Sequence, residues 1–340
     1  MIREITAVIV SWNDEDDLKE CVRALAAARA RLPAGGVRAS LVVVDNGGRV
    51  SASALETLWP GARVLLNASN RGFAPAANQG AAEADGDAVL FLNPDTRADG
   101  EPFLPIARAF DADPGVVAVA PRLVEMNGSL TESGALALSP PGSEDQATFQ
   151  LRRLPTLASD ARELLLIDHA APNNRGRRRA RYAGEDRERP FAVEQAAAAA
   201  LAVRKTVLER IGGFDERFVP AWYEDVDLCD RLAREGVVVY APEARFRHRG
   251  GESAGRLGYD RFLPILYRNA LRYRRSRYGA PAQLTYRALL AMGMALRLAL
   301  LPFRPSVPRP RGEAARAYRR VLGLALGLDS DDSRPTANPS

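Results

Sequence analysis

Short, unbroken runs of apolar residues alternate with helix-like segments along the N-terminal part of this 340-residue chain. Residues 5–11, 41–44, 64–66 and 88–92 are runs typical of strands, and residues 14–31 and 73–84 have the composition of helices. Strands that are buried on both faces have such continuous apolar runs, and a helix between two strands lets them run parallel. The pattern predicts an α/β fold with a mostly parallel sheet and helices on both of its faces.

Polar residues follow four of these predicted strands. They are Ser11 and Asn13 after the first strand, Asp45 after the second, Asn70 after the third, and Asn93 and Asp95 after the fourth. Ligands of open parallel sheets bind beyond the carboxyl ends of the strands. We therefore expect a binding site along this edge of the sheet.

The segment from Gly212 to Gly236 contains seven carboxylates, six of which lie between Gly212 and Asp230 among several aromatic residues. The residues from Val226 onward have helical spacing, and Gly236 is a natural stop for that helix, so Glu224 and Asp225 lie at its start. A carboxylate held there can act as a general base toward a hydroxyl group. Acidic residues at a helix N-terminus also cap the helix and complement its dipole. This segment alone leaves both interpretations open.

Composition sets the size and the compartment. With 46% hydrophobic residues, the chain can form one sizeable catalytic domain and an appendage. Its two cysteines, Cys21 and Cys229, fall in predicted helices and are typical of small buried side chains in a reducing compartment. Met1 leads into the first strand without a signal pattern, so we expect the site to face the cytoplasm.

The charge is distributed unevenly along the chain. Residues 251–340 contain 16 arginines and 6 acidic residues, a net charge of +10, against +5 for the whole chain. We expect residues 256–328 to form a basic, amphipathic helical extension. Its apolar stretch, ALLAMGMALRLALLPF, is about 16 residues long and includes Arg297, which makes it too short and too charged to span a membrane.

Two interpretations of this extension are compatible with each other. Basic amphipathic helices bind anionic membrane surfaces, which would make the protein peripheral at the inner face of the cell membrane. A helical cap packed on the catalytic domain, with a solvated basic face, explains the same pattern. Nucleic-acid binding is not expected, because no recognised binding module accompanies the charge.

Two other regions are rich in proline, glycine and charged residues. We expect a mobile insertion at about residues 139–190, within a catalytic domain that covers residues 1–255, and a disordered tail at residues 329–340. The densest part of the insertion, residues 172–190, is PNNRGRRRARYAGEDRERP. Such a loop could close over bound substrates, but a solvated linker explains the composition as well.

Seven short motifs occur in order along the chain: VIVSWN, VVVDNGG, NRGFAPAANQG, LFLNPDT, GGFDE, YEDVDLC and HRGGES. In this order they resemble the glycosyltransferase family two enzymes, and more narrowly their rhamnosyltransferase-like branch. The resemblance covers roughly residues 5–255. It implies the GT-A fold, which binds nucleotide-diphospho-sugars, and an inverting sugar transfer.

The resemblance also implies roles for single residues. Asp45 matches the residue that reads the nucleobase of the donor, and Asp225, with Glu224, matches the base that deprotonates the acceptor. Asp95 matches the last acid of an Asp-x-Asp motif that holds Mg²⁺ or Mn²⁺ against the donor diphosphate, and His248 can complete that metal site. The donor-binding residues expected on this basis are Ser11, Trp12, Asn13, Asp45, Asn70, Gly72, Phe73, Asn78, Asn93 and Asp95.

Some of these assignments have plainer alternatives. Asp45 and Asp95 stand where turns favour aspartate, and His248, in an arginine-rich run, can be an ordinary surface residue.

The chain also departs from the family pattern. Asn93 replaces the first acid of Asp-x-Asp. Asparagine at this position occurs in the rhamnosyltransferase-like branch. Ala76 and Ala77 replace a Gly-Asn pair, and Ala198 replaces a glycine that faces the donor sugar. Each added methyl group would narrow the space near the ligand.

Together these features predict an inverting, metal-dependent transferase that moves a single sugar, since no processive Gln-x-x-Arg-Trp motif is present. The best donor from the resemblance is dTDP-L-rhamnose. The expected acceptor is a hydroxyl of a lipid-linked glycan or cell-surface polysaccharide intermediate. Open alternatives are another donor sugar, such as galactofuranose, N-acetylglucosamine or mannose, and a catalytically degenerate sugar-nucleotide-binding protein, motivated by Ala76, Ala77 and Ala198.

Overall fold

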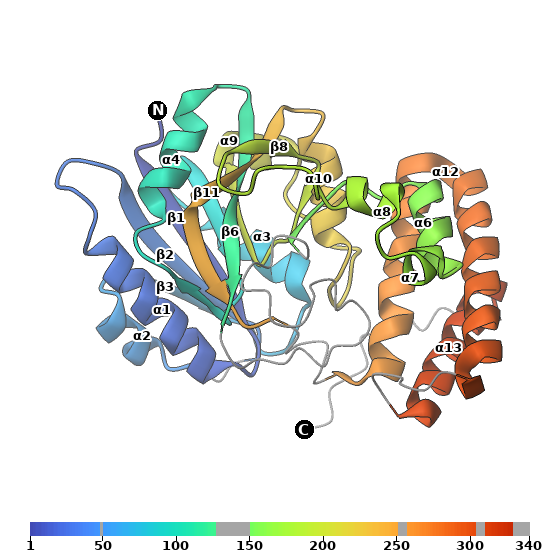
Figure 1. The fold of residues 1–340 in the computed structure, drawn as a ribbon. Coiled ribbons are helices and arrows are strands. Elements are labelled where there is room, and N and C mark those ends of the chain that lie inside the picture. The colour runs from blue at the N-terminus through green and yellow to red at the C-terminus, as the bar shows by residue number, and fades with distance from the viewer. Residues whose placement is uncertain (48–49, 127–149, 251–256, 304–309, 329–340) are drawn as a thin grey trace.

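A mixed β-sheet forms the centre of the molecule (Figure 1). The computed structural model describes residues 1–47, 50–126, 150–250, 257–303 and 310–328. Within these residues nine strands form one sheet. In spatial order they are β3 (Arg63–Leu66), β2 (Arg38–Asp45), β1 (Glu4–Ser11), β4 (Ala88–Leu92), β10 (Ala200–Arg204), β6 (Val116–Glu125), β11 (Val237–His248) and β5 (Thr96–Ala98), with β8 (Phe191–Val193) paired to β11.

The first four strands in this order are parallel, as the alternation of apolar runs and helices predicts. β10 runs antiparallel to both of its neighbours, whereas β6 and β11 are parallel to each other. The register of β1 and β2 places Ser11 opposite Asp45. Both carboxyl ends therefore meet at one edge of the sheet, where ligands of parallel sheets bind.

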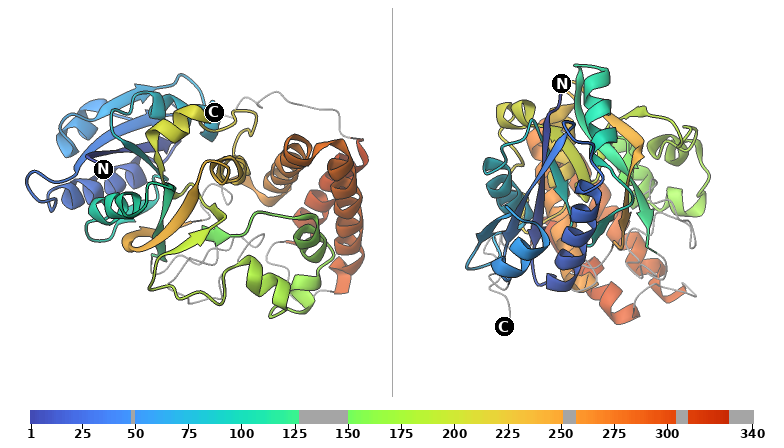
Figure 2. Two further views of the ribbon diagram at one scale, coloured as in Figure 1. Left: turned by 90° about the horizontal axis from the view of Figure 1, so that it is seen from above. Right: turned by 90° about the vertical axis from the view of Figure 1, so that its left-hand side faces the viewer.

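Helices cover both faces of the sheet (Figure 2). Successive side chains of β1 point to opposite faces of the sheet, as expected for a strand. Ile5 and Ile9 pack in the helical layer on one face, and Val8 and Val10 pack in the layer on the other. The first layer contains α1 (Glu15–Arg29), α2 (Ala52–Leu58) and α4 (Phe103–Ala112), and the second contains α3 (Phe73–Ala82), α9 (Lys205–Arg210) and α10 (Glu224–Leu232).

Helix α3 lies very close to the sheet. A Cβ atom at Gly80 would be 2.5 Å from Cγ1 of Val8 and 3.0 Å from Cγ2 of Val44, so only glycine fits there. Ala76 and Ala77 are completely buried in the same layer. They pack in the core, so the expectation that their methyl groups narrow the ligand site is wrong. Their small size lets α3 pack against the sheet.

Residues 150–190 of the insertion form ordered elements. β7 (Leu151–Arg152) pairs with β9 (Gln195–Ala196), and the helices α6 (Leu157–Leu164), α7 (Ile167–Ala170) and α8 (Arg175–Ala180) follow β7. Thr156 and Ser159 form a capping box that begins α6. Residues 139–149 of the predicted insertion and the predicted tail at 329–340 lie outside the described residues.

Two long helices form the C-terminal extension, beside the sheet (Figure 1). α12 (Tyr259–Leu300) leaves helical geometry at Gly279, where φ is 81° and ψ is −175°, so it consists of two helical halves. The short turn η1 (Leu301–Phe303) follows, and α13 (Arg311–Leu326) packs along α12, as does α6. The predicted helical extension is confirmed.

One helix in the described part of the chain, Tyr259–Phe303, is long and apolar enough to cross a membrane, judged by length and composition. The prediction that its apolar stretch is too short is therefore wrong, because the helix continues upstream of that stretch. Only 28% of its most apolar window is buried within the molecule. Arg297 donates hydrogen bonds to the carbonyl oxygens of Glu163 and Leu164, which ties this half of α12 to α6.

Candidate active site

A cavity of about 530 Å³ lies at the carboxyl edge of the sheet. Ser11, Asn13, Asp45, Arg97 and Arg249 are among the residues that line it. Ser11 is buried, and its Oγ has no hydrogen-bond partner within the described residues. A buried hydroxyl without a partner is costly, so a ligand that bonds to it would be favoured there.

Asp45 is fixed by the loop that follows it. Its carboxylate accepts hydrogen bonds from the N–H groups of Gly47 (3.1 Å) and Val50 (2.6 Å). The side chain is almost completely buried, yet it lines the cavity. A carboxylate accepts several hydrogen bonds, so Asp45 can still receive an N–H group of a ligand. The turn interpretation and the nucleobase interpretation are therefore compatible.

A network of side-chain amides holds the loop before α3. Asn46 donates to Oδ1 of Asn70 (2.9 Å) and to the carbonyl oxygen of Gly72 (3.1 Å), and its own Oδ1 accepts from Asn67 (3.1 Å). Asn70 also accepts the N–H of Gly72 (2.8 Å). The structure thus gives Asn70 a role in shaping the loop. Sequence reasoning missed Asn46, although it follows Asp45 directly in the VVVDNGG motif.

Three residues predicted to bind the donor connect this loop to the segment around residues 213–220. Phe73 donates its N–H to the carbonyl oxygen of Pro220 (2.8 Å), and a Cβ atom at Gly72, whose φ is 91°, would be 3.0 Å from the same oxygen. Asn78 accepts the N–H of Phe214 (2.8 Å) and donates to its carbonyl oxygen (2.8 Å). Asn78 therefore serves the scaffold rather than the cavity.

The remaining predicted donor residues lie at the strand ends. Trp12 is half-buried beside Gly47, and Asn13 is exposed with a φ of 55°. Asn93 donates its N–H to the carbonyl oxygen of Ala199 (3.1 Å), which joins the end of β4 to the turn before β10.

Asp95 and His248 form the candidate metal centre. The antiparallel pairing of β5 and β11 places Nε2 of His248 3.4 Å from Oδ1 of Asp95. Oδ2 of Asp95 accepts the N–H of Gly250 (3.1 Å). Burial alone would raise the pKa of Asp95, but His248 and the N–H of Gly250 outweigh it and hold that pKa below its ordinary value. His248 is 3% exposed, so the surface-histidine interpretation is wrong.

These two side chains fit a divalent ion that a ligand helps to hold. A carboxylate oxygen and an imidazole nitrogen are suitable donors for such ions. Within the described residues no group of three or more histidine, cysteine, aspartate or glutamate side chains could hold a metal. An ion at Asp95 and His248 would therefore take its other ligands from phosphate oxygens and water.

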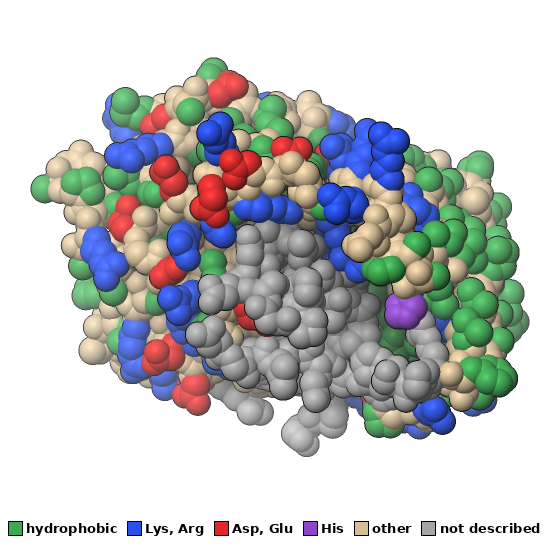
Figure 3. All heavy atoms as spheres, in the orientation of Figure 1, with side chains coloured by type: hydrophobic (Ala, Val, Ile, Leu, Met, Phe, Trp, Pro, Cys, Tyr) green, Lys and Arg blue, Asp and Glu red, His purple; other side chains and the backbone are tan. Residues whose placement is uncertain are grey.

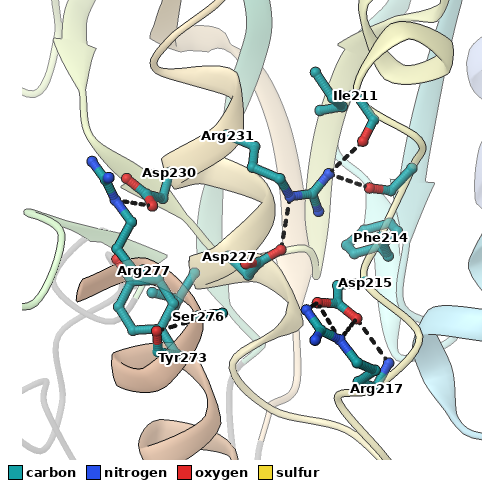
Figure 4. Close-up of polar contacts among 12 residues, drawn as sticks. Ile211, Phe214, Asp215, Arg217, Asp227, Asp230, Arg231, Tyr273, Ser276 and Arg277 are labelled. Carbon is teal, nitrogen blue, oxygen red and sulfur yellow. Dashed lines mark hydrogen bonds and ion pairs between the residues drawn. The ribbon is translucent and has the colours of Figure 1, made fainter. Parts of the chain in front are cut away.

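Four of the six carboxylates between Gly212 and Asp230 have polar partners, three of which appear in Figure 4. The pairs are Asp215 with Arg217, Asp227 with Arg231, Asp230 with Arg277, and Glu216 with Asn78. Within the described residues neither Glu224 nor Asp225 forms an ion pair. The pairing separates these two carboxylates from the structural ones, a distinction that the sequence alone does not make.

Glu224 and Asp225 begin α10, whose N-cap residue, Tyr223, forms no side-chain cap bond. Oδ1 of Asp225 accepts the N–H of Val226 in the first turn (2.8 Å). Burial, followed by the charge of Asp225, raises the pKa of Glu224 well above its ordinary value. Burial also raises the pKa of Asp225, against the N–H groups of Val226 and Ala198 and the charge of Arg152. A carboxylate with a raised pKa is suited to accept a proton near neutral pH.

The sequence profile of glycosyl transferase family 2 matches residues 6–183, which include Asp45 and Asp95. The chain belongs to glycosyl transferase family 2. It is 26% identical over 265 residues to the N-acetylglucosaminyl-diphospho-decaprenol L-rhamnosyltransferase of Mycobacterium tuberculosis, covering 74% of this chain and 78% of the relative. An uncharacterised Sinorhizobium fredii protein is 25% identical over 224 residues, which cover 63% of this chain and 22% of that protein.

Solved structures share the fold. The mannosyltransferase PcManGT from Pyrobaculum calidifontis, in complex with GDP-Man and Mn²⁺, superposes with a TM-score of 0.53 at 15% identity, over 96% of this chain and 86% of that one. GalNAc-T7 with UDP, GalNAc and Mn²⁺ gives a TM-score of 0.56 at 14% identity, over 94% and 55% of the two chains. The predicted GT-A fold is confirmed.

In this glycosyltransferase the C-terminal extension contacts the loop that leads into α10. Asn269 of α12 donates to the carbonyl oxygens of Ala221 (2.9 Å) and Trp222 (3.0 Å). The ring of Trp222 packs edge-on against Phe262, with centroids 4.6 Å apart. The extension is therefore packed on the catalytic domain. Sequence reasoning missed Asn269, because nothing in LYRNALRYRRSRYG distinguishes it from its polar neighbours.

Proposed function

We propose that this glycosyltransferase transfers a single sugar from a nucleotide-diphospho-sugar to a hydroxyl of a lipid-linked glycan, with inversion and with a divalent metal ion. The observation that carries the proposal is the state of Asp225. It is a carboxylate with a raised pKa, it has no ion pair within the described residues, and it is next to the turn at Ala198 and Ala199. That turn bonds to Asn93, two residues before Asp95.

In the proposed reaction Asp225 accepts the proton of the acceptor hydroxyl. The hydroxyl oxygen forms a bond to the anomeric carbon while the bond from that carbon to the diphosphate oxygen breaks, and its electron pair leaves with the nucleoside diphosphate. Attack from the face opposite the leaving group inverts the anomeric centre. Burial, followed by the charge of Asp225, raises the pKa of Glu224 well above its ordinary value, which favours a neutral Glu224 beside the ionised base and limits charge repulsion.

Asp95 and His248 are the residues that would hold Mg²⁺ or Mn²⁺. When bound, such an ion neutralises the negative charge that develops on the leaving diphosphate. The structures of PcManGT and GalNAc-T7 both contain Mn²⁺ together with nucleotide ligands, which supports a divalent ion in this fold.

The leading donor is dTDP-L-rhamnose, which is supported by the 26% identical mycobacterial relative, an L-rhamnosyltransferase. Another hexose, such as the mannose of GDP-Man bound by PcManGT, is the alternative donor. The hypothesis of a degenerate binding protein loses most of its support, because Ala76 and Ala77 lie in the core and Asp95 and Asp225 are retained.

A lipid-linked acceptor is supported by the second half of α12. Its exposed face carries Leu284, Ala288, Met292, Ala295 and Ala299, all apolar, while Leu290, Gly293 and Met294 face the molecule. Hydrophobic side chains gather over this side of the molecule in Figure 3. Exposed apolar faces of this kind mark membrane or protein contacts, and basic helices with such a face lie in the membrane interface. We therefore propose that the enzyme is a peripheral protein at the inner face of the cell membrane.

The function is tested by donor binding and then by transfer. Purified protein with Mn²⁺ is mixed separately with dTDP-L-rhamnose, UDP-N-acetylglucosamine, UDP-galactofuranose and GDP-mannose, and the melting temperature is measured, since a bound ligand raises it. We expect the largest rise with dTDP-L-rhamnose. The same donor should then give nucleoside diphosphate release that depends on polyprenyl-diphosphate-linked N-acetylglucosamine. No shift and no release with any donor would reject the proposed function.

A further inference from the structure

Arg152 of β7 differs from every other arginine in the described part of the chain. Six arginines there have a buried guanidinium nitrogen without a hydrogen-bond partner. Five of them bond through another nitrogen: Arg122, Arg162, Arg187, Arg231 and Arg274. The guanidinium of Arg152 forms no hydrogen bond and no ion pair within the described residues. A largely buried cation without a partner is costly, which indicates that an anion is its partner in the working enzyme.

The pairing of β7 with β9 places this guanidinium beside the proposed base. Arg152 pairs with Gln195, and the next residue, Ala196, exchanges hydrogen bonds with the thiol of Cys229 in α10 (3.4 and 3.5 Å). The negative charge of Glu163, and after it that of Asp225 at the start of the same helix, acts on Arg152. Arg152 thus lies near the atom that takes the proton of the acceptor.

Arg177 and Arg181, from the segment around α8, extend this positive region. Burial, followed by the charges of Arg177 and Arg152, lowers the pKa of Arg181 to about 10. The charges of Glu163 and Asp168 raise the pKa of Arg181, but they do not cancel this lowering. Figure 3 shows basic side chains gathered over this part of the surface, beside the hydrophobic side of the extension.

We propose that Arg152, with Arg181, binds the diphosphate group of a polyprenyl-diphosphate-linked acceptor. This inference rests on the function proposed above. A diphosphate supplies oxygen pairs that match the planar fork of a guanidinium. The donor cavity has separate cations, Arg97 and Arg249, as well as the candidate metal centre. A diphosphate at Arg152 therefore belongs to the acceptor. Helix α6, which follows β7, packs against α12, so Arg152 and the apolar face of α12 lie on connected elements.

The test compares Arg152→Gln with Arg175→Gln, which removes the same charge from an exposed position of α8. Two acceptors are used: a short polyprenyl-diphosphate-linked N-acetylglucosamine and the uncharged octyl glycoside of the same sugar. We expect Arg152→Gln to raise KM for the diphosphate acceptor at least tenfold. The donor KM and the activity on the octyl glycoside should change less than twofold. The melting temperature should not fall, because Arg152 has no hydrogen bond to lose.

A binding measurement separates this inference from the function itself. Inorganic pyrophosphate is titrated calorimetrically in chelator into wild type, Arg152→Gln, Arg175→Gln and Asp95→Ala. Of the three variants, we expect only Arg152→Gln to weaken pyrophosphate binding, by at least tenfold. This measurement does not depend on knowing the donor sugar. A raised donor KM with an unchanged acceptor KM would assign Arg152 to the donor and overturn the inference. Equal losses on both acceptors, or unchanged pyrophosphate binding, would overturn it as well.

Discussion

Asn269 donates its side-chain amide to the carbonyl oxygen of Trp222 (3.0 Å), two residues before Glu224. Asn269 is fully buried, so water cannot replace this bond. Trp222 and Tyr223 both have positive φ values, 73° and 74°, which non-glycine residues rarely adopt. Such a backbone persists only when its surroundings hold it. The C-terminal extension therefore fixes the direction in which the proposed base enters the site.

Replacing Asn269 with aspartate should reduce turnover without reducing donor binding. The substitution places carboxylate oxygens against the carbonyl oxygens of Ala221 and Trp222, and such an unmade buried hydrogen bond costs about 1–3 kcal/mol. If that cost falls on positioning Asp225, kcat drops by roughly tenfold to a hundredfold. Steady-state kinetics and donor titration measure the two effects. Ser276→Ala, which removes a hydroxyl within α12 itself, should leave both unchanged.

Asp225→Asn and Glu224→Gln should have very different effects. Removing a general base costs about 10²–10⁴-fold in rate, so Asp225→Asn should lose transfer by that factor and keep its donor affinity. Glutamine has the shape of a protonated glutamate, so Glu224→Gln should retain activity within a few-fold. Equal losses in the two variants would show that the carboxylates share the proton. Near-normal turnover of Asp225→Asn would instead mean that another group is the base.

The pH profile should report the same base. Burial raises the pKa of Asp225, and the carboxylate accepts a proton only when it is ionised. Values of kcat/KM should therefore rise with pH through that raised pKa and then level off, with the midpoint above the ordinary aspartate value of about 3.9. Glu224→Gln should leave the midpoint in place, because the proposed mechanism has a neutral Glu224 beside the ionised base. A midpoint at or below the ordinary value would contradict a buried base.

Asp95→Ala should abolish metal-dependent donor binding. The carboxylate is the anionic member of the Asp95–His248 pair, and its loss leaves a single imidazole that cannot hold an oxygen-seeking ion alone. Chelator should affect the wild type in the same way, and added Mn²⁺ should restore the wild type only. Donor titration by calorimetry measures both results. Full donor affinity in chelator would show that protein cations hold the diphosphate.

The sheet and the strand-end residues could be predicted from the sequence because they depend on local patterns. Apolar runs identified β1, β2 and β4, and the polar residues after them marked Ser11, Asp45 and Asp95. Burial of His248 could not be predicted in this way, since it depends on the pairing of β5 with β11, which are far apart in sequence.

The contents of the site were harder to predict for the same reason. The six carboxylates between Gly212 and Asp230 look alike until the structure supplies the polar partners of four of them, which leaves Glu224 and Asp225 as the exceptions. Asn78 illustrates the opposite error: it lies in a motif of donor-binding residues, but it bonds to Phe214 from a distant segment. Asn269 and Arg152 act through tertiary contacts that no short motif encodes.

Charges placed on the exposed face of α12 should release the protein from anionic vesicles. Deleting the extension is a poor test, because Asn269 and the buried Arg274–Asp160 pair hold it to the rest of the protein. The variant Leu284→Glu/Met292→Glu removes two apolar side chains from the proposed contact between α12 and the membrane. Each of these side chains would contribute about 1.5–3 kcal/mol to membrane binding if it were fully buried in the bilayer. Vesicle sedimentation should then show affinity at least a hundredfold lower than wild type. Ala27→Glu/Ala82→Glu adds the same charge to exposed positions of α1 and α3 and should bind normally. If both variants bind the vesicles equally well, α12 does not form the membrane contact.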